Sequence, residues 1–169
     1  MPNNILMNIK KYGAVLLAAL LFTWIRIPAY SQLSLSETSS GRNVFPLSAR
    51  ISAPIAYDGS SESAVVGTAA GMLASDIGKV TGRVPEVCSN GKIPSFCHYA
   101  VLAGTLGQSS LIDKLVKDGK IDICQIQGGW ERYAIRLVDN PLSGVRKALV
   151  VVGSDRRGTA YGLLSISRF

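Results

Sequence analysis

Apolar and polar positions near the middle of the chain follow a helical period. Between residues 65 and 80 the apolar side chains recur every three or four positions, which predicts an amphipathic helix with one apolar stripe. Gly82 follows and is predicted to end this helix. Asp76 and Lys79 fall off the stripe, on the side that we expect to face water. The stripe consists of Val65, Ala69, Met72, Leu73, Ile77 and Val80.

Two shorter helices are predicted closer to the end of the chain. Residues 111–116 place their apolar side chains on one helical face, and Ser109 or Ser110 can cap the start of this helix. Gly119 is predicted to stop it. A last helix is expected to begin within Arg157–Thr159 and to run to the end of the chain.

Apolar runs between the helices predict buried strands. Pro54 lies inside the first run, which we therefore expect to form an edge strand or the start of a strand. Asp139-Asn140-Pro141 is predicted to be a turn after the fourth run. Since strands and helices alternate, the fold class is α/β, a mixed sheet with two or three helices packed on it. The runs are Ile51–Tyr57, Val84–Cys88, Tyr99–Ala103, Tyr133–Val138 and Ala148–Val152.

The first 31 residues have the three parts of a secretory signal. Lys10 and Lys11 precede an apolar stretch at 14–25, and Ala29-Tyr30-Ser31 has small residues at the two positions that a signal peptidase reads. A basic residue and a proline end the apolar stretch well short of the roughly 20 residues that a membrane-spanning helix needs. We expect cleavage before Gln32 and export to the periplasm or the medium, without a membrane anchor afterwards.

Composition then limits the remaining chain to one domain. Residues 32–43 are Ser-rich and predicted to be a flexible leader, and residues 44–169 are predicted to be one α/β domain whose final helix is incomplete. Residues 1–31 hold three basic and no acidic side chains, so without them the formal charge falls from +7 to +4. The basic residues are spread out and are not interleaved with aromatic ones, which argues against a nucleic-acid partner. The domain is too short to include a (β/α)₈ barrel, which takes about 250 residues.

Three cysteines would meet an oxidising compartment after export. Cys88 and Cys97 flank a turn-rich loop that could bring their sulfur atoms together, so a disulfide between them is a possible pairing that spacing alone does not establish. Cys124, inside the apolar run Ile121–Ile126, is predicted to be a buried thiol. His98 is the single histidine and no C-x-x-C spacing occurs, so neither a metal site nor a cofactor is expected.

The segment Gly153–Gly162, directly after the last apolar run, contains the chain's most informative motif. Its Gly-Ser-Asp turn predicts a helix cap by Asp155, and two adjacent arginines follow, Arg156 and Arg157. The motif, Gly-Ser-Asp-Arg-Arg-Gly-Thr-Ala-Tyr-Gly, resembles the end of the amino-terminal domain of glycoside hydrolase family 115, the xylan α-glucuronidases.

Other segments resemble the same family in the same order. Asp76–Gly82 is similar to the family's Asp-x-x-x-Val-Thr-Gly helix end, and Gly104-Thr105 is similar to its Gly-Thr turn. Gly129–Tyr133 resembles its Gly-basic-Trp-Glu-x-Tyr segment, with Gly129 where a basic residue is common. The resemblance implies an accessory domain that precedes a catalytic (β/α)₈ barrel, and it implies that the catalytic groups lie in that barrel.

Asp155, Arg156 and Arg157 are the candidate site residues because they follow a strand and begin a helix, where loops commonly face a ligand or another domain. A guanidinium there could hold the carboxylate of a glucuronic acid by paired hydrogen bonds. In the alternative interpretation, which we favour, Asp155 only caps the helix and the arginines pair with acidic residues of the barrel.

Other residues have plainer interpretations. Trp130 beside Glu131 could mark a sugar site, but we expect Trp130 to cover the sheet and Glu131 to face solvent or a neighbouring basic residue. Gly104-x-x-Gly107 lacks the remainder of a phosphate-binding motif and is predicted to be a tight turn. His98 is expected to be a structural histidine. No pair of catalytic carboxylates can be nominated.

Two functional hypotheses remain from the sequence. In the first, the chain is the non-catalytic front of an exported α-glucuronidase, inactive alone, whose partners are a missing or separately encoded barrel and, through the complete enzyme, an acidic xylan oligosaccharide. In the second, it is a free-standing periplasmic module that binds acidic sugars. The apolar residues Leu163, Leu164, Ile166 and Phe169, without a cap after them, indicate an interrupted chain and favour the first hypothesis.

Overall fold

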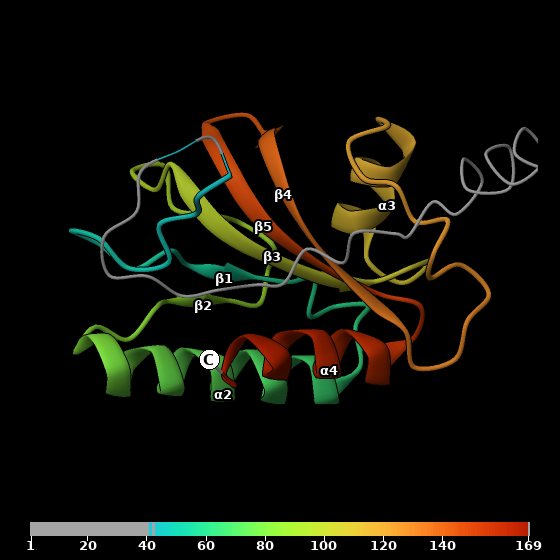
Figure 1. Cartoon of the computed structure of the whole chain (residues 1–169), viewed down its shortest axis with the longest axis horizontal. Coiled ribbons are helices and arrows are strands. Elements are labelled where there is room, and N and C mark those ends of the chain that lie inside the picture. The colour runs from blue at the N-terminus through green and yellow to red at the C-terminus, as the bar shows by residue number, and fades with distance from the viewer. Residues whose placement is uncertain (1–40, 42, 169) are drawn as a thin grey trace, which may run out of the picture. The chain divides into compact units, whose positions relative to one another are not determined.

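The apolar runs of the sequence form a five-stranded sheet covered by helices on both faces (Figure 1). The computed structural model describes residues 41 and 43–168, so the predicted signal and most of the predicted leader lie outside the described residues. The elements, in chain order, are β1 (Ile55–Ala56), α2 (Ala64–Thr81), β2 (Val87–Cys88), β3 (Tyr99–Thr105), α3 (Ser110–Lys117), β4 (Tyr133–Leu142), β5 (Val145–Gly153) and α4 (Arg156–Ile166).

The sheet is mixed, as the sequence predicts. Its strand order is β2-β1-β3-β5-β4, in which the first four strands run parallel and β4 is antiparallel to β5. Although only Ile55 and Ala56 form β1, this strand pairs with a neighbour on each side, so the predicted edge position for Ile51–Tyr57 is wrong and the alternative, the start of a strand, is right. Pro54 lies just outside β1, where its missing N–H costs no ladder bond and its carbonyl accepts from Val101 N at 2.8 Å.

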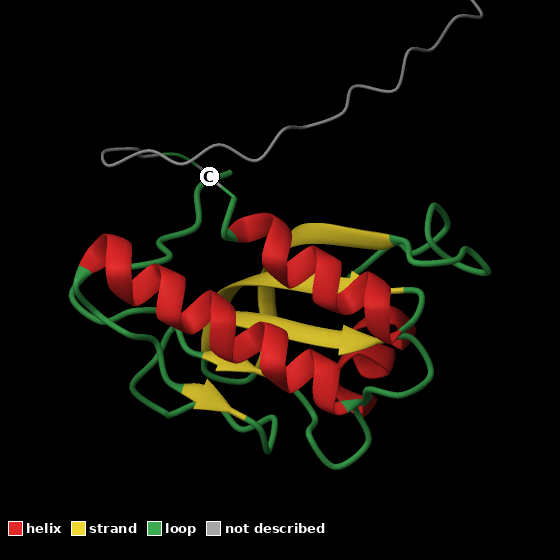
Figure 2. Ribbon diagram, turned by 90° about the horizontal axis from the view of Figure 1, so that it is seen from below, coloured by secondary structure: helices red, strands yellow, loops and turns green. Residues whose placement is uncertain are grey.

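Alternating side chains divide the core between the two faces of the sheet. In β3, Val101 and Ala103 point toward α2 and α4, whereas Ala100 and Leu102 point toward α3. Figure 2 shows α2 and α4 lying beside one another across the same face of the sheet. The long parallel strands are therefore buried on both faces, which explains why they appear as nearly continuous apolar runs.

Helix α2 confirms the predicted helix, and Gly82 ends it in the left-handed conformation with φ 72°. The predicted apolar stripe is partly wrong, since Val65, Met72 and Val80 are exposed by 40%, 51% and 80%. Small side chains allow α2 to lie close to the sheet and to α4, so the helix buries its alanines, and the buried face is turned away from three of the large residues. The buried residues are Val66, Ala69, Ala70, Leu73, Ala74 and Ile77.

The hairpin between β4 and β5 forms later in the chain than predicted. The expected turn at 139–141 is instead part of β4, where the register shifts between Asp139 and Leu142 and Asn140 adopts a positive φ of 49°. This irregularity accommodates Pro141, which β4 tolerates because it is an edge strand. The chain reverses at Ser143-Gly144, where Gly144 has φ 83° and Leu142 pairs with Val145.

The apolar run Ile121–Ile126 forms turns, and the prediction of a buried Cys124 is wrong. Asp122 explains this, because its carboxylate accepts from Cys124 N at 2.9 Å and closes a local turn. Ile121 and Ile126 are buried at the two ends of the segment, while Cys124 between them is exposed.

Helix α4 ends at Ile166, and Ser167 N donates to Leu164 O at 3.2 Å. Leu163 and Ile166, which the sequence analysis took as an uncapped apolar end, are buried in the domain's own core. None of the helices within residues 43–168 combines the length and the hydropathy that crossing a bilayer requires.

Replacement of two helical glycines by alanine is expected to change the stability in opposite directions. A Cβ on Gly158 would overlap the backbone carbonyl of Arg132, whereas a Cβ on Gly71 meets nothing within 4 Å. We expect Gly158→Ala to lower the free energy of unfolding by about 1–3 kcal/mol through overpacking. Gly71→Ala should raise it by about 0.4–1 kcal/mol by restricting the unfolded chain. Urea unfolding of both variants measures the difference, and equal effects would contradict the close approach of α4 to Arg132.

Candidate functional site

The junction of β5 and α4 is held together by the side chain of Asp155. Its Oδ1 accepts from the backbone N–H groups of Arg157 and Gly158, each at 2.9 Å, which confirms the predicted cap. Its Oδ2 accepts from Glu131 N at 2.6 Å, so the same carboxylate also fixes the segment that leads into β4. These hydrogen bonds, first that from Gly158, lower the pKa of Asp155. Asp155 is therefore engaged within the domain.

The two arginines that follow have different surroundings. Arg157 forms an ion pair with Glu131 at 2.8 Å, so Glu131 reaches a neighbouring basic residue, as one interpretation expected. This pair raises the pKa of Arg157. Arg156 is exposed, and no ion pair or hydrogen bond joins its guanidinium to another residue in the part of the chain that the structure describes. Arg156 is thus the arginine at this junction whose charge remains available.

Exposed aromatic rings lie beside this ion pair. The prediction that Trp130 covers the sheet is wrong, because its side chain is 78% exposed. Positive φ angles at Gly128 (68°) and Glu131 (53°) turn the backbone here and direct Trp130 outward. Tyr161, one helical turn after Arg157, is 47% exposed. We call the surface formed by Trp130, Glu131, Arg156, Arg157 and Tyr161 the corner surface.

A second polar group lies at the same edge of the sheet, where the parallel strands end. Glu62 accepts two hydrogen bonds from Thr105, one from its N–H and one from its hydroxyl at 2.9 Å. The Thr105 hydroxyl also lies 2.8 Å from that of Thr159 in α4. This network connects the chain segments that follow β1, β3 and β5. It occupies the place where open α/β sheets commonly bind ligands, because the connections leave β1 and β3 in opposite directions.

The pKa values of Glu62 and of its neighbour Asp58 are shifted in opposite directions. Desolvation raises the pKa of the half-buried Glu62. Hydroxyl groups, first that of Ser60 and then that of Ser110, lower the pKa of Asp58 to about 2. No functional role is assigned to this segment from its sequence, and Ser63, the cap position of α2, makes no side-chain bond to the helix. The available signal is the position of both carboxylates in the short connection between a strand and a helix.

The other residues considered in the sequence analysis make contacts within the domain. Gly104 and Thr105 end β3, and the predicted tight turn follows them, where Gln108 N donates to Thr105 O at 3.1 Å and Gly107 has φ 71°. His98 is exposed, and its Nδ1 lies 3.3 Å from Gly144 O. Within residues 43–168 no group of three or more potential metal ligands comes together.

Cys88 and Cys97 are both buried and both are free thiols in this structure. Burial, followed by the nearby charge of Glu86, raises the pKa of Cys88 to about 11 and also raises that of Cys97. Both are thus weak nucleophiles at neutral pH. A disulfide between them stays a prediction.

Five carboxylates at this edge already have partners, which limits the chemistry available there; Asp113 accepts from Gly107 N at 2.9 Å. Asp58 accepts from serine hydroxyls, Glu62 accepts from Thr105, Glu131 pairs with Arg157, and Asp155 accepts from three backbone N–H groups. The corner surface instead presents an available guanidinium and exposed rings, which are groups suited to binding a carboxylate or a sugar face.

Among known proteins, part of a glycosidase has a similar fold. No protein-family model matches the chain, and no curated protein matches it. Among solved structures, it is similar to a family GH115 4-O-methyl-α-glucuronidase with specificity for decorated arabinogalactans, at 30% sequence identity and a TM-score of 0.52. The match covers 69% of this chain and 13% of that enzyme. The described domain therefore has a fold related to one part of a GH115 α-glucuronidase.

The Glu62 network predicts a specific pH dependence of stability. Because the folded pKa of Glu62 lies above its unfolded value of about 4.5, the unfolded chain loses this proton first as the pH rises. The contribution of Glu62 to stability should therefore fall from about pH 4.5 upward until the folded pKa is passed. Glu62→Gln keeps an acceptor for Thr105 N and a donor for its hydroxyl but has no charge to desolvate.

Urea unfolding between pH 4 and pH 7 tests this. We expect Glu62→Gln to gain stability relative to the unmodified chain as the pH rises from about 4.5. A constant difference between Glu62→Gln and the unmodified chain over this range would show that burial does not raise the Glu62 pKa.

Proposed function

We propose that this domain is the non-catalytic amino-terminal part of an exported glycoside hydrolase that removes glucuronic or 4-O-methylglucuronic acid side chains from a polysaccharide. The observation that carries the proposal is the similarity in both fold and sequence to a segment of a GH115 α-glucuronidase. The motif at Gly153–Gly162 also supports it, because its residues resemble the end of the amino-terminal domain of this family.

A non-catalytic role is supported by the state of the carboxylates. Retaining and inverting glycosidases need two carboxyl groups about 5–9.5 Å apart, one of them protonated at the start of the reaction. The carboxylates at the carboxyl edge of this sheet are held by serines, Thr105, Arg157 and the α4 cap. The chain also spans only 13% of the similar enzyme, which leaves room there for a separate catalytic barrel.

The corner surface is proposed to face the catalytic barrel at the rim of its site. Arg156 is exposed and unbonded among the described residues, and Trp130 presents most of its ring to solvent. A guanidinium can bind the carboxylate of a uronic acid through two parallel hydrogen bonds, and an indole face can pack on the C–H face of a sugar. The Glu131–Arg157 pair holds one arginine within the domain, so Arg156 is the residue proposed to reach outward.

The proposal defines the sugar that is removed more narrowly than the polymer that carries it. The sequence resemblance implies xylan, whereas the similar enzyme acts on decorated arabinogalactans. Both the resemblance and the similar enzyme imply a glucuronic acid derivative as the sugar that is removed, and that sugar is the proposed substrate unit.

An enzymatic assay tests the function. We expect the chain alone to release no glucuronic acid from glucuronoxylan or arabinogalactan, and the product of the same reading frame continued beyond the Phe169 codon to release it. Arg156→Ala in that longer product should lower kcat/KM by about tenfold, the loss of one charged hydrogen bond. Lys92→Ala, which removes an exposed cation elsewhere, should leave kcat/KM unchanged. Downstream sequence without a barrel, or activity of the chain alone, would overturn the proposal.

Export is proposed from the signal-like residues 1–31. We expect the mature protein to begin at Gln32, because Ala29-Tyr30-Ser31 provides the cleavage site. Amino-terminal sequencing of the protein recovered from periplasm or medium measures this. An amino terminus at Met1 or Met7 in protein from the cytoplasm would contradict it.

The alternative function is a free-standing binding module for acidic sugars. The exposed Arg156 and Trp130 favour it as much as they favour a rim of a larger site. The apolar residues of the last helix do not distinguish the two hypotheses, because Leu163 and Ile166 pack into the domain core. Micromolar binding of glucuronic acid oligosaccharides by the chain alone, without a barrel downstream, would support this alternative.

A further inference from the structure

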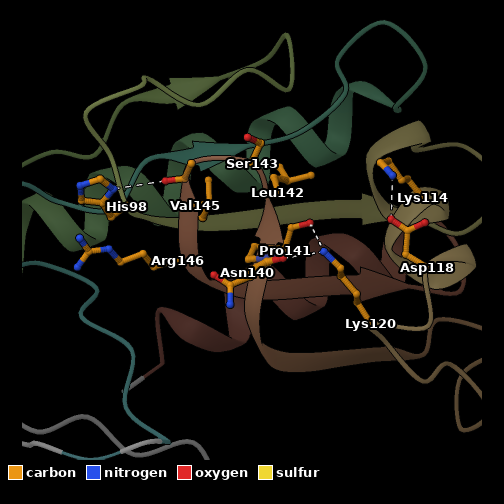
Figure 3. A pocket seen from close by; sticks show the side chains of 11 residues that line it. His98, Lys114, Asp118, Lys120, Asn140, Pro141, Leu142, Ser143, Val145 and Arg146 are labelled. Atoms are coloured by element: carbon orange, nitrogen blue, oxygen red, sulfur yellow. Dashed lines mark hydrogen bonds and ion pairs between the residues drawn. The ribbon is translucent and has the colours of Figure 1, made fainter.

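A hollow of about 600 Å³ opens on the α3 face of the sheet, at the edge opposite the corner surface (Figure 3). The lengths of the elements explain it. The eight residues of α3 extend about 12 Å, whereas the seven residues of β3 extend about 23 Å. Helix α3 therefore covers only part of this face, and the hollow lies between its last turn, the start of β3 and the β4–β5 hairpin.

Strand register places two basic side chains in this hollow. Tyr99 of β3 is paired with Lys147 of β5, and one step earlier Arg146 N donates to His98 O at 2.8 Å. Ala100 and Ala148, two residues further along the same strands, belong to the core beneath α3. Since side chains alternate along a strand, His98 and Arg146 project to this same face.

The hollow carries more positive than negative charge. Lys114, Lys120 and Arg146 line it together with a single carboxylate, that of Asp118, which Lys114 neutralises at 2.8 Å. In Figure 3, His98 and Arg146 lie toward one side of the hollow and the Lys114–Asp118 pair lies toward the other. A net charge of one sign at a concave surface attracts ligands of the opposite sign.

Two of the cations are suited to binding a ligand. The Lys120 ammonium donates to the backbone oxygens of Asn140 at 2.6 Å and Pro141 at 3.0 Å, which fixes its position and leaves one of its three N–H groups. The Arg146 guanidinium makes no hydrogen bond or ion pair with any residue of the described chain. Lys120 thus offers a fixed charge and Arg146 an adaptable one.

The wall between these cations is apolar. Pro141 and Val145 are buried beneath the surface and Leu142 is partly exposed, so the hollow combines positive rims with an aliphatic floor. A ligand that matches both features has a carboxylate on a ring whose C–H face is apolar. The volume lies within the roughly 300–1,000 Å³ range of pockets that hold small ligands, which exceeds the need of a simple inorganic ion.

We propose that this hollow binds the carboxylate of a uronic-acid-bearing oligosaccharide through Arg146 and Lys120. The anionic group follows from the charges of the hollow, while the choice of a saccharide rests on the proposed function. The site is separate from the corner surface, because it lies at the amino ends of the parallel strands and the corner lies at their carboxyl ends.

Calorimetric titration of the chain tests the proposal, with an oligosaccharide that carries one glucuronic acid and a neutral oligosaccharide of the same length. We expect only the acidic one to bind. Arg146→Ala should weaken its binding by about tenfold, which corresponds to about 1.4 kcal/mol, through the loss of a hydrogen bond to a charged group. Lys120→Ala should weaken it similarly. Lys92→Ala, which removes an exposed cation elsewhere, should leave the affinity unchanged.

Each other outcome overturns the inference in a distinct way. Equal binding of the neutral oligosaccharide removes the role of the carboxylate, and equal competition by inorganic phosphate shows a general anion site. Loss of affinity in Arg156→Ala but not in Arg146→Ala moves the sugar to the corner surface. Lys120→Ala removes hydrogen bonds to the hairpin, so its fold is checked by circular dichroism. Arg146→Ala removes no side-chain hydrogen bond or ion pair of the described chain, and it is therefore the decisive variant. Release of glucuronic acid by the longer product is scored separately and does not depend on Arg146.

Discussion

The carboxylate of Asp155 is the interaction on which the carboxyl edge of this domain depends. It accepts three backbone N–H groups, two from the first turn of α4 and one from Glu131 before β4. Two further bonds, Ser154 N to Arg132 O at 2.8 Å and Arg132 N to Ser154 Oγ at 3.0 Å, hold the same segments together. Close packing completes the junction, since Gly158 lies directly against the Arg132 backbone. The positions of Trp130, Glu131 and both arginines depend on this junction, in which the cap is the central interaction.

How far the sequence predicts the fold depends on whether a feature is local. The Asp155 cap, the Ser109 cap and the Gly82 helix end were predicted, because each depends on residues within one turn of one another. The strands β3 and β5 were found because burial on both faces leaves a long apolar run. The sequence did not predict which face of α2 is buried, because this depends on how closely its alanines allow the helix to approach α4 and the sheet. The hairpin at Ser143-Gly144 was missed because an edge-strand irregularity absorbs Pro141.

The candidate site was predictable to a smaller degree for the same reason. The motif identified Asp155, Arg156 and Arg157, but the pairing of Arg157 with Glu131 joins residues 26 positions apart. The Glu62–Thr105 contact spans 43 positions and arises only because β1 and β3 are neighbours. The hollow brings together His98, Lys120 and Arg146 from three separate segments. No sequence spacing predicts such groupings before the strand order is known.

The corner surface and the hollow differ in whether their proposed binding requires a second domain. They lie at opposite ends of the parallel strands, and the nine residues of β5 between them extend about 30 Å. A single sugar unit cannot contact both, so the two proposed sites require two separate acidic groups. The corner surface is built on a helix start and a backbone turn, where loops meet other domains in α/β folds. The hollow is built on main-chain carbonyls and a hairpin within the domain, and Arg146 and Lys120 need no second domain to be in place. Binding in the hollow is therefore a property that the isolated chain should already possess, whereas the function of Arg156 depends on what packs beside it.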